Sequence, residues 1–552
     1  MLQRPCVRMH NWWRLVITAG IALPCIAMAQ NSTRIETLVS AGRLGDMRVP
    51  DFRAYQSSVR EFYAAGGYAP AWVKGGAVSA SGLAMIQNFQ NAWKKGLDPE
   101  DYDASRWDGR RQALQAGGDP AAFDVALTVN AMRYISDLHL GRINPRHVKF
   151  DLPVKNRKYD LADFLRNQVL PAADPTAALA SLEPPFGGYQ RTEAALVRYV
   201  DLARKDDGEK LPVPAKPIDP GQPYAGVPRL ARLLLLVGDL PPGTDAAGSP
   251  QVYGGAVVEG VKRFQREHGL DADGRLGAGT VKELNVPLQQ RVRQLQLALE
   301  QWRWLPDQFS APPIIVNIPD FRVRALDAAN NVDLDMRVVV GKALNTKTPV
   351  FARDMTFVVF RPYWNVPPGI MRRSIIPALR RDRNYVAKNR YEVTTQNGTV
   401  VTSGAVSDDV LAQLQSGKLT VRQKPGPDNA LGLVKLMFPN EYYVYLHSTP
   451  STELFARTRR DFSSGCIRVE KPAELTAWAL RNNSGWTLAR VQQAMQSGPN
   501  NVTVKLARPI PVFIVYGTAI AYPNEEVHFY DDLYGHDAQL MEALRKRSPP
   551  SS

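Results

Sequence analysis

One cysteine and one histidine stand out as residues that could do chemistry together. Cys466 follows the small residues Ser463, Ser464 and Gly465, and His447 lies nineteen residues before the thiol. A thiol with a pKa of about 8.5 is a poor nucleophile at neutral pH, but a neighbouring imidazole can take its proton. Small residues also let a substrate carbonyl approach backbone N–H groups, which can stabilise an oxyanion. The pair therefore predicts nucleophilic catalysis by a cysteine.

The residues around this pair predict the elements that must hold it. Side chains alternate along a strand, so we expect Tyr443, Tyr445 and His447 of the stretch EYYVYLHSTP to share one face. A helix signal begins at Pro472, just after the thiol. We therefore expect Cys466 in an exposed turn between a strand and a helix. The alternative for the histidine is an ordinary place in the core.

The other two cysteines, Cys6 and Cys25, fall in a segment with the pattern of a signal peptide. Residues 1–29 contain three arginines, no acid, a short apolar run and the cleavage pattern Ala27-Met28-Ala29. We expect export to the periplasm, with an uncleaved inner-membrane anchor as the alternative. After export, Cys466 is a lone thiol that cannot form an intramolecular disulfide. It is then either buried and inert or kept for its reactivity.

The composition favours an acidic polymer as partner. The chain carries a formal net charge of +15, which attracts anionic partners. It shows no basic and aromatic stripe and no helix-turn-helix or zinc-finger spacing, so we expect no nucleic acid. In an exported protein, the carboxylate-rich peptides of the cell wall are the acidic polymer at hand. The seven histidines show no metal-ligand spacing, so we expect neither a metal nor a cofactor.

The chain of 552 residues is long enough for several domains. Its first part is alanine-rich with helical periodicity, and from Pro312 the pattern changes to the period of two that is typical of strands. A proline and glycine break at Asn365–Ile370 interrupts the β pattern. We predict a signal peptide at 1–29, a helical scaffold domain at 30–215, a small helical module at 226–286, a linker helix at 287–310, a mainly β catalytic domain at 311–525 with an insertion at about 370–420, and a C-terminal segment and tail at 526–552.

Several stretches carry a resemblance to a known family. HSTP followed by SSGCIRV resembles the L,D-transpeptidase catalytic domain of the YkuD-like family, and YWNVPPGI and RQKPGPDNALGLVKLMFPN are similar to its large YcbB-type members. The run from Ala256 to Asn285 resembles a peptidoglycan-binding type 1 module. The implied fold is multidomain α+β, with a helical scaffold domain, a small helical peptidoglycan-binding module and a mainly β YkuD-like catalytic domain that carries an inserted lid.

The resemblance implies roles for the residues at the matching positions. Cys466 would be the nucleophile and His447 the base, and the Ser448 carbonyl would orient the imidazole. The N–H groups of Gly465 and Cys466 would form the oxyanion hole. Many relatives carry a histidine where this chain has Ser464, so the base must be His447. The substrate-binding candidates are Arg468, Tyr445, Ser464, Trp364 and Asn365. A structural ion pair is the alternative role for the arginine.

The implied activity is the cross-linking of peptidoglycan. The family cleaves the bond between the diamino acid and the terminal D-alanine of a tetrapeptide stem, forms a cysteine acyl-enzyme and transfers the acyl group to the third-position amine of another stem. The implied partners are peptidoglycan stem peptides, carbapenem antibiotics as covalent inhibitors and other cell-wall enzymes. An L,D-carboxypeptidase or other cysteine peptidase of the wall stays open, because water competes for the same intermediate. A non-catalytic peptidoglycan-binding adaptor is the third alternative.

An arginine-rich run follows the proline and glycine break. MRRSIIPALRRDRNYVAKNR holds seven cations and one acid, and guanidinium groups bind carboxylates bidentately. We expect either a lid that closes over an anionic stem peptide and excludes water, or a solvated helical face.

Overall fold

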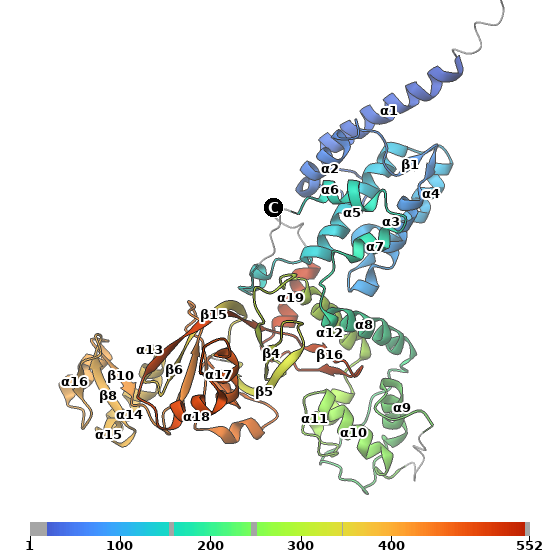
Figure 1. Ribbon diagram of the computed structural model, residues 1–552. Helices are drawn as coiled ribbons and strands as arrows, with labels where there is room; N and C mark the ends of the chain where they lie inside the picture. The colour runs from blue at the N-terminus through green and yellow to red at the C-terminus, as the bar shows by residue number, and fades with distance from the viewer. Residues whose placement is uncertain (1–18, 154–158, 244–250, 345, 547–552) are drawn as a thin grey trace, which may run out of the picture.

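The computed structural model describes residues 19–153, 159–243, 251–344 and 346–546. Residues 1–18 of the predicted signal peptide lie outside this part, and the first helix, α1 (Ala19–Ala41), follows them. In these four segments, no helix combines the length and apolarity that crossing a membrane requires. Figure 1 shows a helical domain at one end of the molecule, a strand-rich domain toward the other end and a small helical module beside it. The predicted multidomain α+β fold class is confirmed.

The scaffold is built around one long helix, α5 (Pro120–Leu140). Asp119 caps its N-terminus, Pro120 occupies its first position and Gly141 ends it at φ +77°. Side chains on all sides of α5 are buried, so it forms the centre of this core. The elements around it are α2 (Gln56–Ala64), β1 (Val73–Lys74), β2 (Ala77–Val78), α3 (Ala80–Gln90), α4 (Trp107–Gln115), α6 (Leu161–Phe164) and α7 (Pro175–Ala180).

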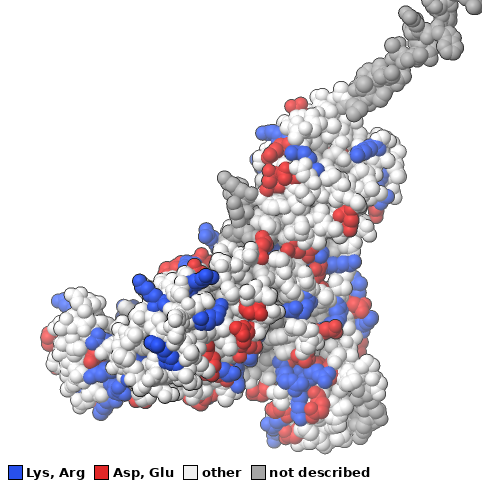
Figure 2. Space-filling view, viewed as in Figure 1, with Lys and Arg blue, Asp and Glu red and all other residues white. Residues whose placement is uncertain are grey.

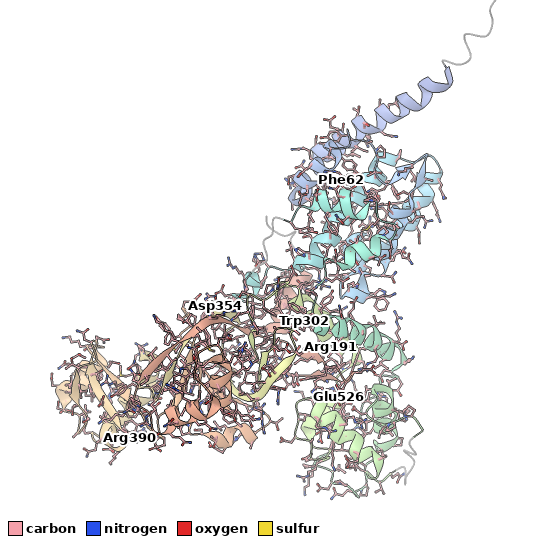
Figure 3. The ribbon with its side chains drawn as sticks, in the orientation of Figure 1. Phe62, Arg191, Trp302, Asp354, Arg390 and Glu526 are labelled. Carbon is pink, nitrogen blue, oxygen red and sulfur yellow. The ribbon has the colours of Figure 1, made fainter. Side chains whose placement is uncertain are left out.

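A second layer joins the scaffold to the rest of the chain. The two helices α8 (Gly187–Lys205) and α12 (Leu288–Trp302) pack together, and a hairpin of β16 (Ala519–Ala521) and β17 (Val527–Phe529) completes their core. Figure 3 shows Arg191 and Trp302 at this joint, where Arg191 donates to the Ala521 carbonyl at 3.2 Å. The last part of the chain thus packs against helices that precede the strand-rich domain.

Two buried charges fix α12 against the scaffold. Glu300 and Arg303 are fully buried. Glu300 accepts from the N–H of Ile143 at 2.9 Å, and Arg303 donates to the Tyr189 hydroxyl at 2.9 Å and to the Lys95 carbonyl. Buried charges are retained when they are paired and hydrogen-bonded. This cluster therefore sets the orientation of the joint.

The small module consists of three helices around one apolar core. They are α9 (Val227–Val237), α10 (Ala256–Glu267) and α11 (Ala278–Leu284). The buried side chain of Gln265 on α10 holds the DADG turn that follows. It accepts from the N–H of Gly274 at 2.8 Å and donates to Asp273 Oδ1 at 3.0 Å. An amide side chain thus stabilises the turn between the last two helices.

The C-terminal region is built on a nine-stranded mixed sheet. Its strands are β3 (Ile314–Asn317), β4 (Arg322–Leu326), β5 (Val332–Gly341), β6 (Phe351–Phe360), β11 (Val434–Met437), β12 (Leu446–His447), β13 (Asp461–Ser463), β14 (Ile467–Val469) and β15 (Val502–Val515). They lie in the order β13-β5-β14-β12-β11-β6-β15-β3-β4, and β4 also pairs with β5, which closes the sheet on itself. The helices α17 (Pro472–Ala479), α18 (Leu488–Gln496) and α19 (His536–Arg545) contribute to the same core.

An insertion between β6 and β11 forms a body with its own core. Its four-stranded sheet has the order β7-β10-β8-β9. Its elements are β7 (Trp364–Asn365), α13 (Pro368–Ile370), a π-helix (Met371–Ile375), α14 (Ile376–Arg381), α15 (Tyr385–Lys388), β8 (Tyr391–Thr395), β9 (Val400–Thr402), α16 (Asp408–Gln415) and β10 (Leu419–Gln423). Figures 1 and 3 show the insertion, which contains Arg390, at the end of the molecule away from the scaffold.

Replacing Glu300 with alanine should destabilise the joint between α12 and the scaffold. The change removes the carboxylate whose Oε2 lies 3.9 Å from Arg303 Nη1, and leaves that guanidinium buried. Breaking a buried ion pair costs about 3–5 kcal/mol, which urea unfolding followed by tryptophan fluorescence would measure. Glu542→Ala removes an exposed partner of Arg545 and should leave the unfolding midpoint unchanged. Equal midpoints for both variants would contradict the role of the buried pair.

Candidate active site

Cys466 lies in the short turn between two strands, β13 and β14. We expected a turn between a strand and a helix, but β14 stands between the thiol and α17. The reason is that Ile467 and Val469 are buried β-branched residues, and β14 pairs in parallel with β12 and antiparallel with β5. A position at the start of a central strand holds the thiol on a rigid element.

Hydrogen bonds fix the turn that carries the thiol. Gly465 adopts φ +118°, a conformation that favours glycine. Its N–H donates to Ser463 Oγ at 3.1 Å, and its carbonyl accepts from Thr348 Oγ1 at 2.8 Å. Ser463 Oγ in turn donates to the Cys466 carbonyl at 2.6 Å. Ser464 is exposed between these residues.

The thiol lies beside two tyrosines. Cys466 Sγ donates to the Tyr443 carbonyl at 3.6 Å, and the Tyr445 carbonyl accepts from the N–H of the next residue after the thiol, Ile467, at 3.1 Å. Burial raises the pKa of Cys466, against the lowering effects of Tyr445 and of the nearby cations Arg468 and Lys435. The thiol is therefore protonated at rest near pH 7.

His447 is buried and contacts a backbone carbonyl. Its Nδ1 lies 2.5 Å from the Ser448 carbonyl oxygen, which fits a tautomer with the proton on Nδ1 and a free lone pair on Nε2. Burial and the charge of Arg468 lower the pKa of His447 to about 3, against the opposing carbonyls of Ser448 and Leu431. The imidazole is therefore neutral near pH 7. In this resting arrangement, the thiol donates to a carbonyl rather than to the ring.

A glycine packs against the residue that contacts the imidazole. Gly432 has φ +61°, and a Cβ at this position would lie 2.5 Å from Ser448 Oγ and 2.7 Å from the Thr449 nitrogen. The N–H of Gly432 donates to the Asn429 carbonyl at 2.7 Å. The loop that leaves the insertion therefore touches Ser448 directly, with no room for a side chain.

The strand before His447 is shorter than we expected. β12 contains only Leu446 and His447. Tyr443, which we placed on the face of His447, has φ +55° and is 84% exposed. The cause is Asn440, whose side-chain amide makes four hydrogen bonds to backbone groups of this turn. Tyr445 does stay beside His447, with 5.7 Å between the ring centroids.

Two cations flank His447 on the sheet. Lys435 of β11 pairs with His447 on one side, and Arg468 of β14 pairs with it on the other. Directly paired residues point to the same face of a sheet, so the three side chains form a row. Lys435 Nζ also lies 5.9 Å from the centroid of the Tyr445 ring. Burial lowers the pKa of Lys435 and that of Arg468.

The sequence analysis missed Lys435. Val434 and Leu436 on either side of it are fully buried, and Lys435 points to the opposite face of the sheet. A lysine inside a strand of otherwise apolar residues is the signal that would have found it. Arg468, which we did single out, has its Nε buried without a hydrogen-bond partner among the described residues.

The remaining candidates belong to the insertion. Trp364 and Asn365 form β7, which pairs with β10, and the Trp364 ring lies 6.3 Å from that of Tyr391. Their contact with a substrate stays a prediction. In the arginine-rich run, Arg383 pairs with Asp408 inside the insertion, whereas Arg380–Arg381 is exposed at the end of α14. Part of the run is therefore structural, and the role of a lid stays a prediction.

Comparisons with known families match three parts of the chain. Residues 57–196 match a family described as a scaffold domain, and residues 227–284 match one described as a "Putative peptidoglycan binding domain". Residues 312–504 match the L,D-transpeptidase catalytic domain, YkuD.

A curated protein of Haemophilus influenzae, named "Putative L,D-transpeptidase", is 31% identical over 261 residues. The match covers 47% of this chain and 50% of the relative, so the chain spans about half the length of that protein. The predicted resemblance to the family is thus confirmed by two independent matches. The chain contains a YkuD-family L,D-transpeptidase catalytic domain at residues 312–504, together with a scaffold domain and a peptidoglycan-binding domain.

Proposed function

We propose that the protein is a peptidoglycan L,D-transpeptidase that links the third-position diamino acids of two stems through a cysteine acyl-enzyme and releases the terminal D-alanine. The observation that carries this proposal is the sheet register. It aligns His447 with Arg468 and so places Cys466, two residues before that arginine, next to Tyr445. Catalytic and peptidoglycan-binding domains in one chain support the wall polymer as substrate.

The geometry supports a reaction in two steps. Cys466 Sγ attacks the carbonyl of the diamino acid, and the free Nε2 of His447 takes the thiol proton as the C–S bond forms. The same proton then passes to the departing nitrogen of D-alanine when the C–N bond breaks. In the second step, the acceptor amine attacks the thioester, gives its proton to Nε2, and the sulfur leaves and recovers that proton.

The oxyanion of each step needs a donor near the thiol. We predicted the N–H groups of Gly465 and Cys466 for this role. The Gly465 N–H already donates to Ser463 Oγ, so the Cys466 N–H is the better placed of the two. Donors that are fixed before the reaction stabilise the developing charge without reorganisation. The hydrogen bonds around Gly465 thus support a preformed turn.

The proposed substrate contacts and the proposed location of the protein follow from the same function. Arg468, Tyr445 and the exposed Ser464 line the thiol turn, and we propose that they contact the stem peptide, with Trp364 and Asn365 as contacts from the insertion. The domains imply a place outside the cytoplasm, and we propose the periplasm, with carbapenems as covalent inhibitors of the thiol. Other wall enzymes are proposed partners.

Replacing Cys466 with alanine should abolish both the cross-linked product and the covalent adduct with a carbapenem, because no nucleophile remains. Purified protein is incubated with tetrapeptide muropeptides, and products and intact protein mass are measured together. The wild type should give a dimeric muropeptide and a transient adduct on Cys466. Hydrolysed stems alone would favour a carboxypeptidase, and turnover by Cys466→Ala would refute the proposed nucleophile.

Gly432→Ala should slow the acylation of Cys466 at least about tenfold, because the new Cβ would displace Ser448 and with it the carbonyl that orients His447. Stopped-flow acylation by a carbapenem measures the rate. The matched control is Gly417→Ala, which carries the same strain at φ +76° but meets no atom within 4 Å. Equal rates for the two variants would refute a role for this contact.

A further inference from the structure

The charge balance around the thiol is unusual for a cysteine and histidine pair. In a thiolate–imidazolium pair, the histidine carries the positive charge. Here His447 is buried between Lys435 and Arg468 on adjacent strands, and a third positive charge between two cations is disfavoured in a medium of low dielectric constant. The imidazole is therefore poorly placed to act as the counter-ion of the sulfur.

Lys435 has no carboxylate partner of its own in the described part of the chain. Its neighbours across the sheet are His447 on β12 and the apolar Val359 on β6. Its amine lies over the Tyr445 ring, and the Tyr445 carbonyl accepts from the N–H of Ile467, the residue next to the thiol. The charge of Lys435 thus faces the sulfur rather than an acid.

The other charged and titratable groups around the sulfur are few. Arg468 of β14 lies two residues beyond Cys466, which stands in the turn before that strand, and its charge acts on the thiol. Glu453, on the 3₁₀ turn Thr452–Ala456, acts on Arg468 and is exposed. With Lys435, Tyr445 and His447, these complete the set that faces the thiol among the residues that the structure describes.

We propose that Lys435 is a positioning residue that, together with Arg468, supplies the fixed positive charge for the Cys466 thiolate. His447 then accepts the thiol proton only transiently during attack, and the charge that develops on sulfur is balanced by the two flanking cations. The proposal rests on the proposed function only in taking Cys466 as the nucleophile.

The test is the pH profile of Cys466 alkylation by iodoacetamide, a small neutral reagent, followed by peptide mass mapping. Lys435→Met should shift the midpoint of the profile upward by about one pH unit, so the rate near pH 7 falls about tenfold. The rates should converge above both midpoints. Lys435→Arg should restore the wild-type profile, and Lys505→Met, which removes an exposed lysine of β15, should leave it unchanged.

An unchanged midpoint for Lys435→Met would overturn the proposal. A rate that falls equally at every pH would also overturn it, because that result describes a structural role. Alkylation needs no turnover, so the result is independent of cross-linking. If wild-type protein makes no dimeric muropeptide but the midpoint shifts, the proposed function fails while this inference stands.

A second feature lies at the other end of β14. A cleft of about 720 Å³ separates the peptidoglycan-binding domain from the catalytic domain, and Arg266, Arg457 and Lys471 are among its lining residues. All three are exposed and have no ion-pair partner among the described residues. The walls touch where Thr458 Oγ1 donates to Asp271. Figure 2 shows basic and acidic side chains gathered over the module beside the catalytic domain.

The cleft has a surplus of positive charge. Five acids line it. Asp335 and Glu470 are already paired with Arg322 and Arg337, and Asp320 and Glu283 are paired with Arg324 and Arg291, which leaves Asp531 against the three unpaired cations. Burial, together with the neighbouring Arg337, lowers the pKa of the lining Arg460 to about 10. Unpaired guanidinium and ammonium groups in a cleft of this size fit carboxylate groups of a peptide.

We infer that this cleft binds a carboxylate-bearing stem peptide of the wall polymer other than the reacting stem. Neither Cys466 nor His447 is among the residues that line this cleft, and β14 lies between the thiol and Lys471, so the two places are separate. This inference deepens the proposed function, because it assigns an anchoring site for a second part of the same polymer.

The test uses full-length protein whose Cys466 has been blocked by iodoacetamide, so that binding is measured without turnover. Calorimetry with soluble tetrapeptide muropeptides should show an affinity at least about fivefold lower for Arg457→Gln/Lys471→Gln. Lys505→Gln/Arg508→Gln removes the same charge from exposed positions of β15 and should bind as the wild type does. A muropeptide with amidated carboxylates should not distinguish the variants.

Equal affinity of both double variants for the acidic muropeptide would overturn the anchoring site. A loss that persists with the amidated muropeptide would also overturn it, because the ligand would then not be a carboxylate. The acylation assay of unblocked protein is separate, so loss of acylation with intact binding would refute the proposed function alone.

Discussion

The parallel pairing of β12 with β14 is the constraint on which the site depends. It aligns Leu446 with Ile467 and His447 with Arg468, and these short strands are held by β11 on one side and β5 on the other. Because the register of a strand decides which face each side chain occupies, a shift by one residue would send His447 to the interior and Leu446 to the thiol. The buried apolar residues of both strands therefore specify the chemistry indirectly. The closure of the sheet by β4 and β5 leaves this register no free edge at which to slip.

The same register brings positively charged side chains close together, which is electrostatically unfavourable. It places Lys435 and Arg468 on either side of a buried imidazole, with no carboxylate between them, and burial works against the charge of each cation. Such a cluster lowers stability, whereas the joint at Glu300 and Arg303 uses opposite charges to fix two elements. Unpaired buried charges are typical of functional sites, where a local loss of stability is tolerated because the surrounding core offsets it. The apolar core beneath the sheet supplies that compensation.

The sequence predicted the architecture well, because the spacing of apolar residues and the positions of proline and glycine breaks are local properties of the chain. Helical periodicity before the change at Pro312 and strand periodicity after it gave the confirmed α+β class. What it could not give were contacts set by distant residues. No pattern in the sequence near Tyr443 indicates that the Asn440 amide ends the expected strand. The position of Lys435 beside His447 becomes evident only when β11 is seen to pair with β12. The pair of Cys466 and His447 was accessible because its residue types are rare in this chain, whereas its flanking cations are common types whose meaning depends on their neighbours.

The position of the thiol within the sheet also bears on how a polymer can be handled. β14 begins at the thiol and ends at the cleft beside the peptidoglycan-binding domain, while the loop that leaves the insertion touches Ser448. The peptidoglycan-binding domain and the insertion thus meet the sheet that carries the thiol at different places. A rigid strand between two contact points fixes their separation, and binding energy gained at one point can then orient the substrate at the other. Because each stem is short, such coupling requires that the two points hold different segments of one wall strand. In the proposed function, the sheet is a spacer between two carboxylate-bearing ligands as well as a support for the thiol.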